Sequence, residues 1–194
     1  GMWRGPSAAN ETERCIKKDV TILPELLKEA GYRTGIFGKW HLGYQEPNTP
    51  NERGFDEFYG FLGGAHPYLP GRASRLLHNG QPYAEDMHLT DYFTEKALDF
   101  IGDCARRKQP FFCYVPYNAV HGPLWRKEQP KTSGKAEWLT HYAKSGVELP
   151  RRDYNAVLGH MDHSVGRLVG LLEELKLQDN TLVIYFSDNG ACLE

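Results

Sequence analysis

The sequence has 194 residues and a formal net charge of −2, and 40% of its residues are hydrophobic. A chain of this size and composition is typical of one globular α/β domain or of part of a larger one. The near-neutral charge gives no basic footprint for nucleic acid. No apolar run approaches the roughly 20 residues that span a bilayer, and the first residues lack the order of a secretory signal. We therefore expect neither nucleic acid nor a membrane span, and the compartment is left open.

The first predicted helix–strand pair covers residues 19–42. Apolar residues recur at helical spacing from 22 to 30, with Asp19 or Thr21 as the N-cap and Gly31 as the stop. The segment YRTGIFGKWHL, residues 32–42, is strand-like in composition. Residues 43–86 show no periodicity and are rich in Gly, Pro, Asn and aromatic residues, so they predict a long loop.

Two more helix–strand pairs follow. The segment LTDYFTEKALDFIGDCARR, residues 89–107, predicts a helix capped by Thr90, and PFFCYVPYN after it predicts a strand. Residues 119–150 read as irregular. Residues 151–177 then predict the clearest amphipathic helix, and NTLVIYFSDNG predicts a fully buried strand because its apolar residues run on without alternation.

This threefold repeat of helix and strand predicts an α/β layered fold with a mostly parallel sheet. In such sheets the ligand site gathers outside the carboxyl ends of the strands. That rule selects three segments, which are GKWHLG (38–43), YNAVHGP (117–123) and SDNG (187–190).

The first strand end pairs Lys39 with His41. Alternate side chains of an extended segment share a face, so Lys39 and His41 are expected to point together while Trp40 and Leu42 enter the packing. An ammonium at about 4 Å from an anion gains about 4 kcal/mol at an effective dielectric near 20, before desolvation costs. The alternative is an edge strand whose lysine and histidine meet only water.

The other two strand ends carry further candidates. His121 follows the second strand and can bind an anion when protonated or donate a proton to a leaving group. Asp188 and Asn189 follow the third and offer the hard oxygens that Ca²⁺ and Mg²⁺ prefer. The alternatives are a loop histidine without a role and an Asp-Asn-Gly turn. His160 and His163 lie three apart on the third helix, where a partly solvated flank explains them better than a zinc site.

The four cysteines indicate no disulfide framework. They stand in unrelated contexts without a C-x-x-C pair, and we interpret them as reduced and structural. The sequence also lacks the P-loop, the G-x-G-x-x-G and the G-x-S-x-G motifs. It therefore does not contain the usual sequence signatures of nucleotide-binding proteins or serine hydrolases. The cysteines are Cys15, Cys104, Cys113 and Cys192.

Five blocks of the sequence resemble the formylglycine-dependent sulfatase family, within the alkaline phosphatase superfamily. The segment AGYRTGIFGKWHLG, residues 30–43, resembles the second signature of the family almost position for position. The later blocks follow in the order of the family and extend the resemblance from about residue 19 onward; they are RGFDEFYGFLGG, LTDYFTEKALDFI, PFFCYVPYNAVHGP and LQDNTLVIYFSDNG. The resemblance implies a three-layer αβα sandwich with a mostly parallel sheet, of the alkaline phosphatase-like kind.

The resemblance also implies a role for each candidate. Lys39 would contact the sulfate and stabilise its developing charge, and His41 would hydrogen-bond the hydrated formylglycine. His121 would contact the sulfate or the leaving-group oxygen as a candidate general acid. Asp188 and Asn189 would be two ligands of a Ca²⁺ ion. The implied substrate is a sulfate ester of a sugar or an aryl alcohol.

Departures from the family pattern limit what the chain is expected to do alone. No cysteine lies in a C-x-P-S-R type motif, and the Asp-Asp metal pair and the later basic residue of the family are missing. We therefore interpret residues 1–194 as an internal part of a sulfatase catalytic domain, inactive alone, weak in calcium binding and prone to self-association through an incomplete sheet. A phosphodiesterase or phosphonate hydrolase of the same superfamily and a non-catalytic sulfatase-like binding module remain the alternatives.

Overall fold

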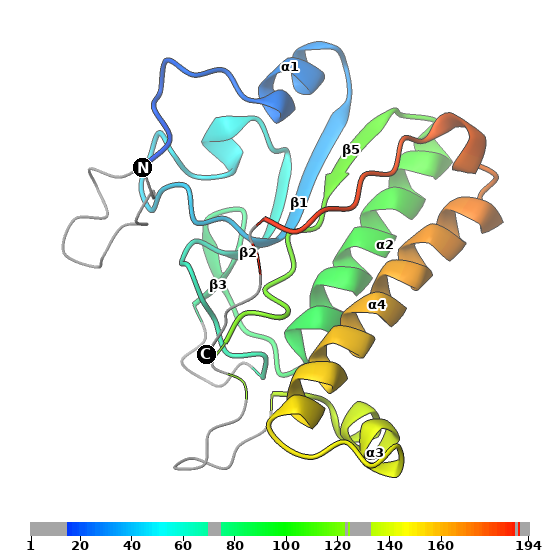
Figure 1. The fold of residues 1–194 in the computed structure, drawn as a ribbon. Helices are drawn as coiled ribbons and strands as arrows, with labels where there is room; N and C mark the ends of the chain where they lie inside the picture. The colour runs from blue at the N-terminus through cyan, green and yellow to red at the C-terminus, as the bar shows by residue number, and fades with distance from the viewer. Residues whose placement is uncertain (1–14, 70–74, 123, 125–132, 189, 191–194) are drawn as a thin grey trace.

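A five-stranded sheet in the order β4-β3-β2-β1-β5 forms the centre of the computed structural model (Figure 1). The structure describes residues 15–69, 75–122, 124, 133–188 and 190. The strands are β1 (Arg33–Lys39), β2 (Glu57–Phe61), β3 (Leu76–His78), β4 (Gln81–Tyr83) and β5 (Phe111–Tyr114). The helices are α1 (Leu23–Glu29), α2 (Leu89–Arg107), α3 (Ala136–Lys144) and α4 (Arg151–Glu174), with short 3-10 turns η1 (Asn51–Arg53) and η2 (Gln178–Asn180).

The strand β1 lies between β2 and β5 and runs parallel to both. Its last residue, Lys39, is level with Phe61 at the end of β2, and Ile36 is level with Tyr114 at the end of β5. The hairpin β3–β4 adds two antiparallel strands beside β2. The predicted α/β class is thus confirmed with a mixed sheet, whose parallel part holds the three adjacent carboxyl ends where a ligand site is expected.

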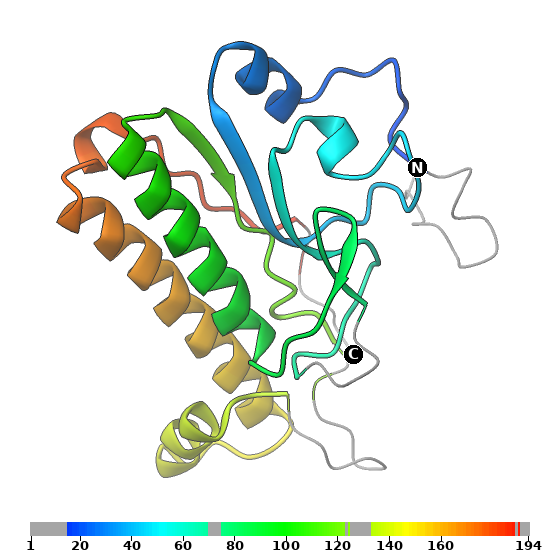
Figure 2. The ribbon, with the colours of Figure 1, turned by 180° about the vertical axis from the view of Figure 1, so that it is seen from behind.

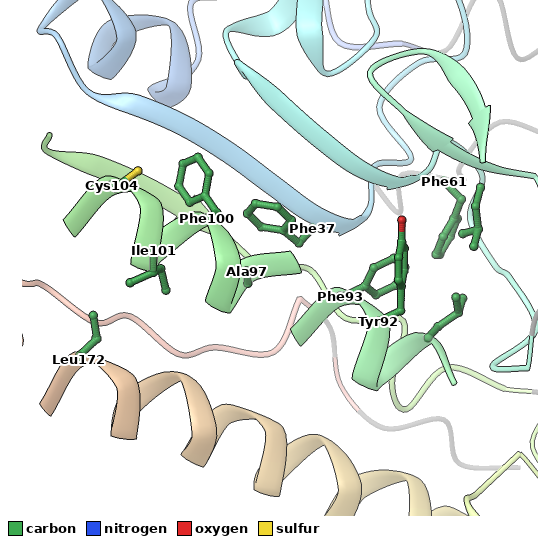
Figure 3. Packing of buried hydrophobic residues seen from close by; sticks show 11 residues of the cluster. Phe37, Phe61, Tyr92, Phe93, Ala97, Phe100, Ile101, Cys104 and Leu172 are labelled. Atoms are coloured by element: carbon green, nitrogen blue, oxygen red, sulfur yellow. The ribbon is translucent and has the colours of Figure 1, made fainter. Parts of the chain in front are cut away.

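Helix α2 covers one face of the sheet, and α4 packs along α2 (Figures 1 and 2). Phe37 of β1 meets Phe100 of α2 with ring centroids 5.3 Å apart, at the middle of the main core cluster (Figure 3). On the opposite face of the sheet a smaller cluster gathers Ile36, Trp40 and Phe55. Among the described residues no helix is long and apolar enough to cross a membrane.

The buried apolar stripe predicted for α2 is confirmed, whereas the one predicted for α1 is wrong. Tyr92 and Phe93 in the first turns of α2 are buried, but the cap is the side chain of His88, which accepts from the Thr90 amide, rather than Thr90 itself. Helix α1 buries only Pro24, and the predicted apolar positions Leu23 and Leu26 are more than half exposed. The physical reason is that Glu25 fixes the start of α1 by accepting from the Ile22 amide, while the helix lies at the margin of the sheet.

The two predicted irregular stretches contain regular structure. Residues 43–86 hold β2, β3, β4 and η1, and the stretch 119–150 holds α3, so both loop predictions were wrong in part. Glycines and aromatic residues concealed the strands, because β2 contributes Phe61 to one core cluster and Phe58 to the other, and its sequence does not alternate apolar with polar residues. Arg53 anchors the connection before β2: it is 2% exposed, its Nε donates to Glu25 at 2.7 Å and its guanidinium also donates to the Val20 carbonyl at 2.6 Å.

The predicted third strand is not part of the sheet. Residues 181–187 carry no strand, and the side chains of Leu182 and Ile184 are 85% and 71% exposed. Within the described ranges β5 is the edge of the sheet, and residues 181–187 do not pair with it, so their apolar side chains stay exposed. The prediction of a fully buried strand is therefore wrong for this structure, although the apolar composition on which it rested is real.

Candidate functional site

The ends of β1, β2 and β5 approach one another closely because glycine stands at the contact points. The Lys39 amide donates to the Pro116 carbonyl at 2.9 Å, which joins the end of β1 to the segment after β5. A Cβ at Gly38 would lie 2.2 Å from that carbonyl oxygen, and Gly38 has a φ of +146°. A Cβ at Gly60 would lie 1.9 Å from the Gly38 oxygen. Side chains at either position would force the three strand ends apart.

Lys39 and His41 lie where β1 leaves the sheet, and both are half-buried. The strand ends at Lys39, and the chain then follows β2 through bonds from the amides of Trp40 and His41 to the carbonyls of Phe61 and Leu62, each 3.0 Å long. His41 has a φ of +56°. The extended alternation expected through residue 42 is thus wrong, and Leu42 is 37% exposed instead of packed.

The imidazole of His41 lies against the backbone of the loop after β2. A Cβ at Gly64 would be 2.6 Å from Cε1 of His41. A non-glycine residue in the left-handed region is uncommon and costs conformational energy, and such residues concentrate at functional sites. The close fit and the left-handed backbone together fix this ring against the loop after β2.

His121 lies on the exposed loop after β5. Its Nδ1 is 2.6 Å from the Gly122 carbonyl, which requires a proton on Nδ1 and leaves Nε2 as the free position of the neutral ring. Its backbone amide donates to the Asn118 carbonyl at 2.8 Å. The parallel topology therefore places the segments that carry Lys39, His41 and His121 at the same edge of the sheet.

Asp188 is exposed and lies near β5. Burial raises the pKa of Tyr114 in β5, and the charge of Asp188 adds a smaller increase. Asn189 lies outside the described residues. Calcium takes six to eight oxygen ligands, and Asp188 is the single predicted calcium ligand within the described ranges. These residues do not form a calcium site by themselves.

A buried polar cluster that the sequence did not predict lies at the start of α2. The side chains of His88, Asp91 and His160 bring potential ligand atoms within 4.8 Å of one another, a spacing that could hold a metal ion. His160 is 1% exposed, so its interpretation as a partly solvated helix flank was wrong, whereas His163 is exposed. Asp91 and His160, which share a hydrogen bond, stand 69 positions apart in the sequence. No local spacing could therefore have revealed this cluster.

Hydrogen bonds already use most of the ligand positions in this cluster. His88 accepts from the Thr90 amide through Nδ1 and lies 3.0 Å from the Ser133 carbonyl through Nε2. Asp91 bonds His160 at 2.7 Å and the Lys135 ammonium at 2.9 Å. An ammonium on the only carboxylate opposes a second cation. The described arrangement is therefore a hydrogen-bond network that ties α2, α4 and the segment before α3 together.

This network predicts a loss of stability in mild acid. Burial lowers the pKa of His88 from 6.5 to about 4, against the opposing effect of the Ser133 carbonyl. Because the unfolded chain binds this proton more readily, the stabilisation is complete above pH 6.5 and is lost as the pH falls toward 4. The free energy of unfolding should decrease by roughly 3 kcal/mol over that interval.

Denaturant unfolding of the wild type and of His88→Asn between pH 7 and 4 checks this expectation. Asparagine keeps an N-cap acceptor but does not titrate, so the variant should show a flatter profile. Asp91 does not obscure the comparison: burial opposes the shift, but bonds from His160 and Lys135 lower its pKa to about 2, so its contribution is lost only below about pH 4. Parallel profiles for the two proteins would contradict the assignment.

The fold and these strand ends define the class of protein. The chain belongs to the Sulfatase family, whose sequence profile it matches over residues 2–194. It is 35% identical to mouse N-acetylgalactosamine-6-sulfatase over 188 residues, covering 89% of this chain and 33% of that protein. It is 33% identical to mouse arylsulfatase J, covering 91% of this chain and 30% of the relative. The chain thus spans about a third of the length of these relatives.

A solved structure gives the same assignment in three dimensions. The crystal structure of Ps i-CgsB in complex with k-i-k-neocarrahexaose superposes with a TM-score of 0.76 at 32% sequence identity. The match covers 88% of this chain and 41% of that one. The predicted alkaline phosphatase-like α/β fold is confirmed by this likeness.

Proposed function

We propose that the protein is a sulfuric-ester hydrolase that acts on a sulfated carbohydrate, with Lys39, His41 and His121 at its anion site. The observation that carries the proposal is the junction of the β1, β2 and β5 ends. There His41, two residues after Lys39, has a left-handed backbone and lies against Gly64, and the Lys39 amide donates to the Pro116 carbonyl in the segment that leads to His121. A packing role alone requires none of this strain.

The three side chains suit the charges of sulfate ester cleavage. The Lys39 ammonium would neutralise charge that develops on the sulfate oxygens, the contribution that is commonly largest in such sites. His41, two residues further along the chain, would donate a hydrogen bond to the reacting group. His121, protonated, would give its proton to the alcohol oxygen as the ester bond breaks. Water adds across the bond overall and releases an alcohol and sulfate.

Calcium and formylglycine enter this proposal only through the family resemblance. Asp188 and Asn189 would supply two of the six to eight oxygens that Ca²⁺ binds. None of the four cysteines lies in a C-x-P-S-R sequence. We assign no step to either group and expect no turnover from these 194 residues alone.

The names of two similar proteins support the carbohydrate class. One is named for the 6-sulfate of N-acetylgalactosamine, and a structural neighbour was solved with a neocarrahexaose. The test is sulfate release, measured by ion chromatography, from N-acetylgalactosamine 6-sulfate by the complete natural reading frame that encodes this chain. An aryl phosphodiester and a phosphonate ester serve as parallel substrates. Faster turnover of the phosphorus esters would favour the phosphodiesterase alternative, and no turnover with retained sulfate binding would favour a binding module.

The exposed segment 181–187 predicts self-association of the 194-residue chain. Five consecutive apolar side chains, Leu182 to Phe186, are each at least 56% exposed beside an edge strand. Such segments pair with other chains. Light scattering coupled to size exclusion should show a species larger than 22.1 kDa.

The double variant Ile184→Lys and Phe186→Lys should restore the monomer, because it places two charges on the segment. Leu23→Lys with Leu26→Lys is the matched control, since it makes the same change at two exposed leucines of α1. A wild-type monomer, or equal effects of both double variants, would contradict this expectation.

A further inference from the structure

The hydroxyl of Tyr68 connects the loop after β2 to the loop after β5. Tyr68, in the loop after β2, is 5% exposed, and its hydroxyl lies 3.0 Å from the Asn118 carbonyl and 3.0 Å from the His121 carbonyl. A phenol has one proton to donate, so the two carbonyls of the loop after β5 converge on one donor. Both carbonyls belong to the turn that carries the His121 imidazole.

A second hydrogen bond crosses between the same loops in the opposite direction. The side-chain amide of Asn118 donates to the His66 carbonyl at 3.2 Å, and Asn118 is 3% exposed. The turn after β5 therefore accepts from the buried hydroxyl of Tyr68 and donates through the buried side-chain amide of Asn118. Two such bonds restrict the turn far more than its own backbone bond does.

Tyr68 is itself fixed to the rigid part of the fold. Its carbonyl accepts from the Leu89 amide at 2.8 Å, at the first residue of α2. Its ring stacks on His88 with centroids 5.6 Å apart and an interplanar angle of 29°. Burial, with a smaller contribution from the charge of Asp153, raises the pKa of Tyr68, so the hydroxyl keeps its proton and remains a donor.

We propose that Tyr68 is a positioning residue that holds the His121 turn at the sheet edge where Lys39 and His41 lie. The inference rests on the proposed function only for its catalytic consequence. The hydroxyl has no contact with substrate in this role; it acts through the backbone of residues 118 and 121. Helix α2, through Tyr68, thus positions His121, the candidate general acid, in the loop after β5.

Tyr68→Phe tests this with little disturbance, because it removes one oxygen and keeps the ring on His88. Tyr92→Phe is the matched control: Tyr92 is 1% exposed, and its buried hydroxyl lies near Tyr83 of β4 rather than at the loop after β5. Amide hydrogen exchange on the 194-residue chain should be about fivefold faster for residues 119–122 in Tyr68→Phe and unchanged there in Tyr92→Phe.

Activity gives the second measurement, in the complete reading frame. Tyr68→Phe should lower kcat for sulfate release by about tenfold to a hundredfold, while KM stays within about twofold, because the turn is displaced rather than the anion site removed. Tyr92→Phe should leave both constants unchanged. If Tyr68→Phe melts below the assay temperature, all proteins are compared at a temperature where each is folded.

The outcomes separate the two proposals. A wild type without sulfate release refutes the proposed function, and the exchange result then still decides the role of Tyr68. Exchange at residues 119–122 that is the same in both variants would overturn the inference, as would a fall in activity of equal size in Tyr92→Phe.

Discussion

Replacing Lys39 with alanine should reduce kcat/KM for sulfate ester hydrolysis by about 10²–10³-fold, with little change in stability. Lys39 is the last residue of β1 and half-buried, at the edge where β1 and β2 end together. A cation held there meets the charge that develops on the sulfate oxygens, and the loss of one such preorganised group typically costs a factor of this size. Steady-state kinetics of the complete reading frame measure it.

The control for this variant is Lys144→Ala, which removes an exposed lysine at the end of α3. It should leave kcat/KM within about twofold, because a surface charge remote from the strand ends is screened by salt. Equal losses in the two variants would indicate a general effect of net charge. Full activity of Lys39→Ala would remove Lys39 from the site.

Substitution of Gly38 by alanine should destabilise the fold by about 2–4 kcal/mol. The new Cβ would lie 2.2 Å from the Pro116 oxygen and 2.8 Å from its carbonyl carbon, and the φ of +146° is rarely adopted by a side-chain-bearing residue. Overpacking against backbone and an unfavourable dihedral angle each cost about 1–3 kcal/mol. Because the contact joins β1 to β5, the substitution should also displace Lys39 relative to the His121 loop.

Gly102→Ala is the matched control and should change stability in the opposite direction. Gly102 lies within α2, and nothing is found within 4 Å of its added Cβ. Alanine in a helix interior is favoured over glycine by about 0.5–1 kcal/mol. Urea denaturation of both variants distinguishes the two sites, and a neutral Gly38→Ala would show that the strand ends tolerate separation.

The helices α1, α2 and α4 and the parallel strands β1 and β5 could be predicted because their signals are local. Tyr92, Phe93 and Ala97 recur at helical spacing in α2, and all three are buried. The strand β1 follows directly after the Gly31 stop, where φ is +85°. Such signals depend on residues a few positions apart, which the sequence shows directly.

The missed elements depend on contacts between distant residues. The sequence of β2 does not alternate, since the strand is buried by α2 on one side and by the Phe55 cluster on the other. The error at residues 181–187 has the opposite origin: apolar composition predicts a strand, but whether a segment joins a sheet also depends on contacts with residues far away in the sequence. Composition alone does not show those contacts.

The roles of Lys39 and His41 stay predictions, and the structure corrects one reason given for pairing them. Both residues lie where β1 ends, but His41 has a left-handed backbone and packs against Gly64, so strand alternation does not set the direction of its side chain. The roles of Tyr68 and His88 could not be predicted, because their partners stand about 50 positions away. The sequence signal that did indicate the site was the presence of glycines at the strand ends.

The proposed function requires that Lys39, His41 and His121 share one sulfate-binding edge. Histidine side-chain NMR of the 194-residue chain, titrated with inorganic sulfate, measures this. We expect the imidazole resonances of His41 and His121 to shift together with one apparent Kd, the exposed His163 not to respond, and Lys39→Ala to abolish both shifts. Shifts of His41 and His121 with different Kd values, or shifts that persist unchanged without Lys39, would contradict it.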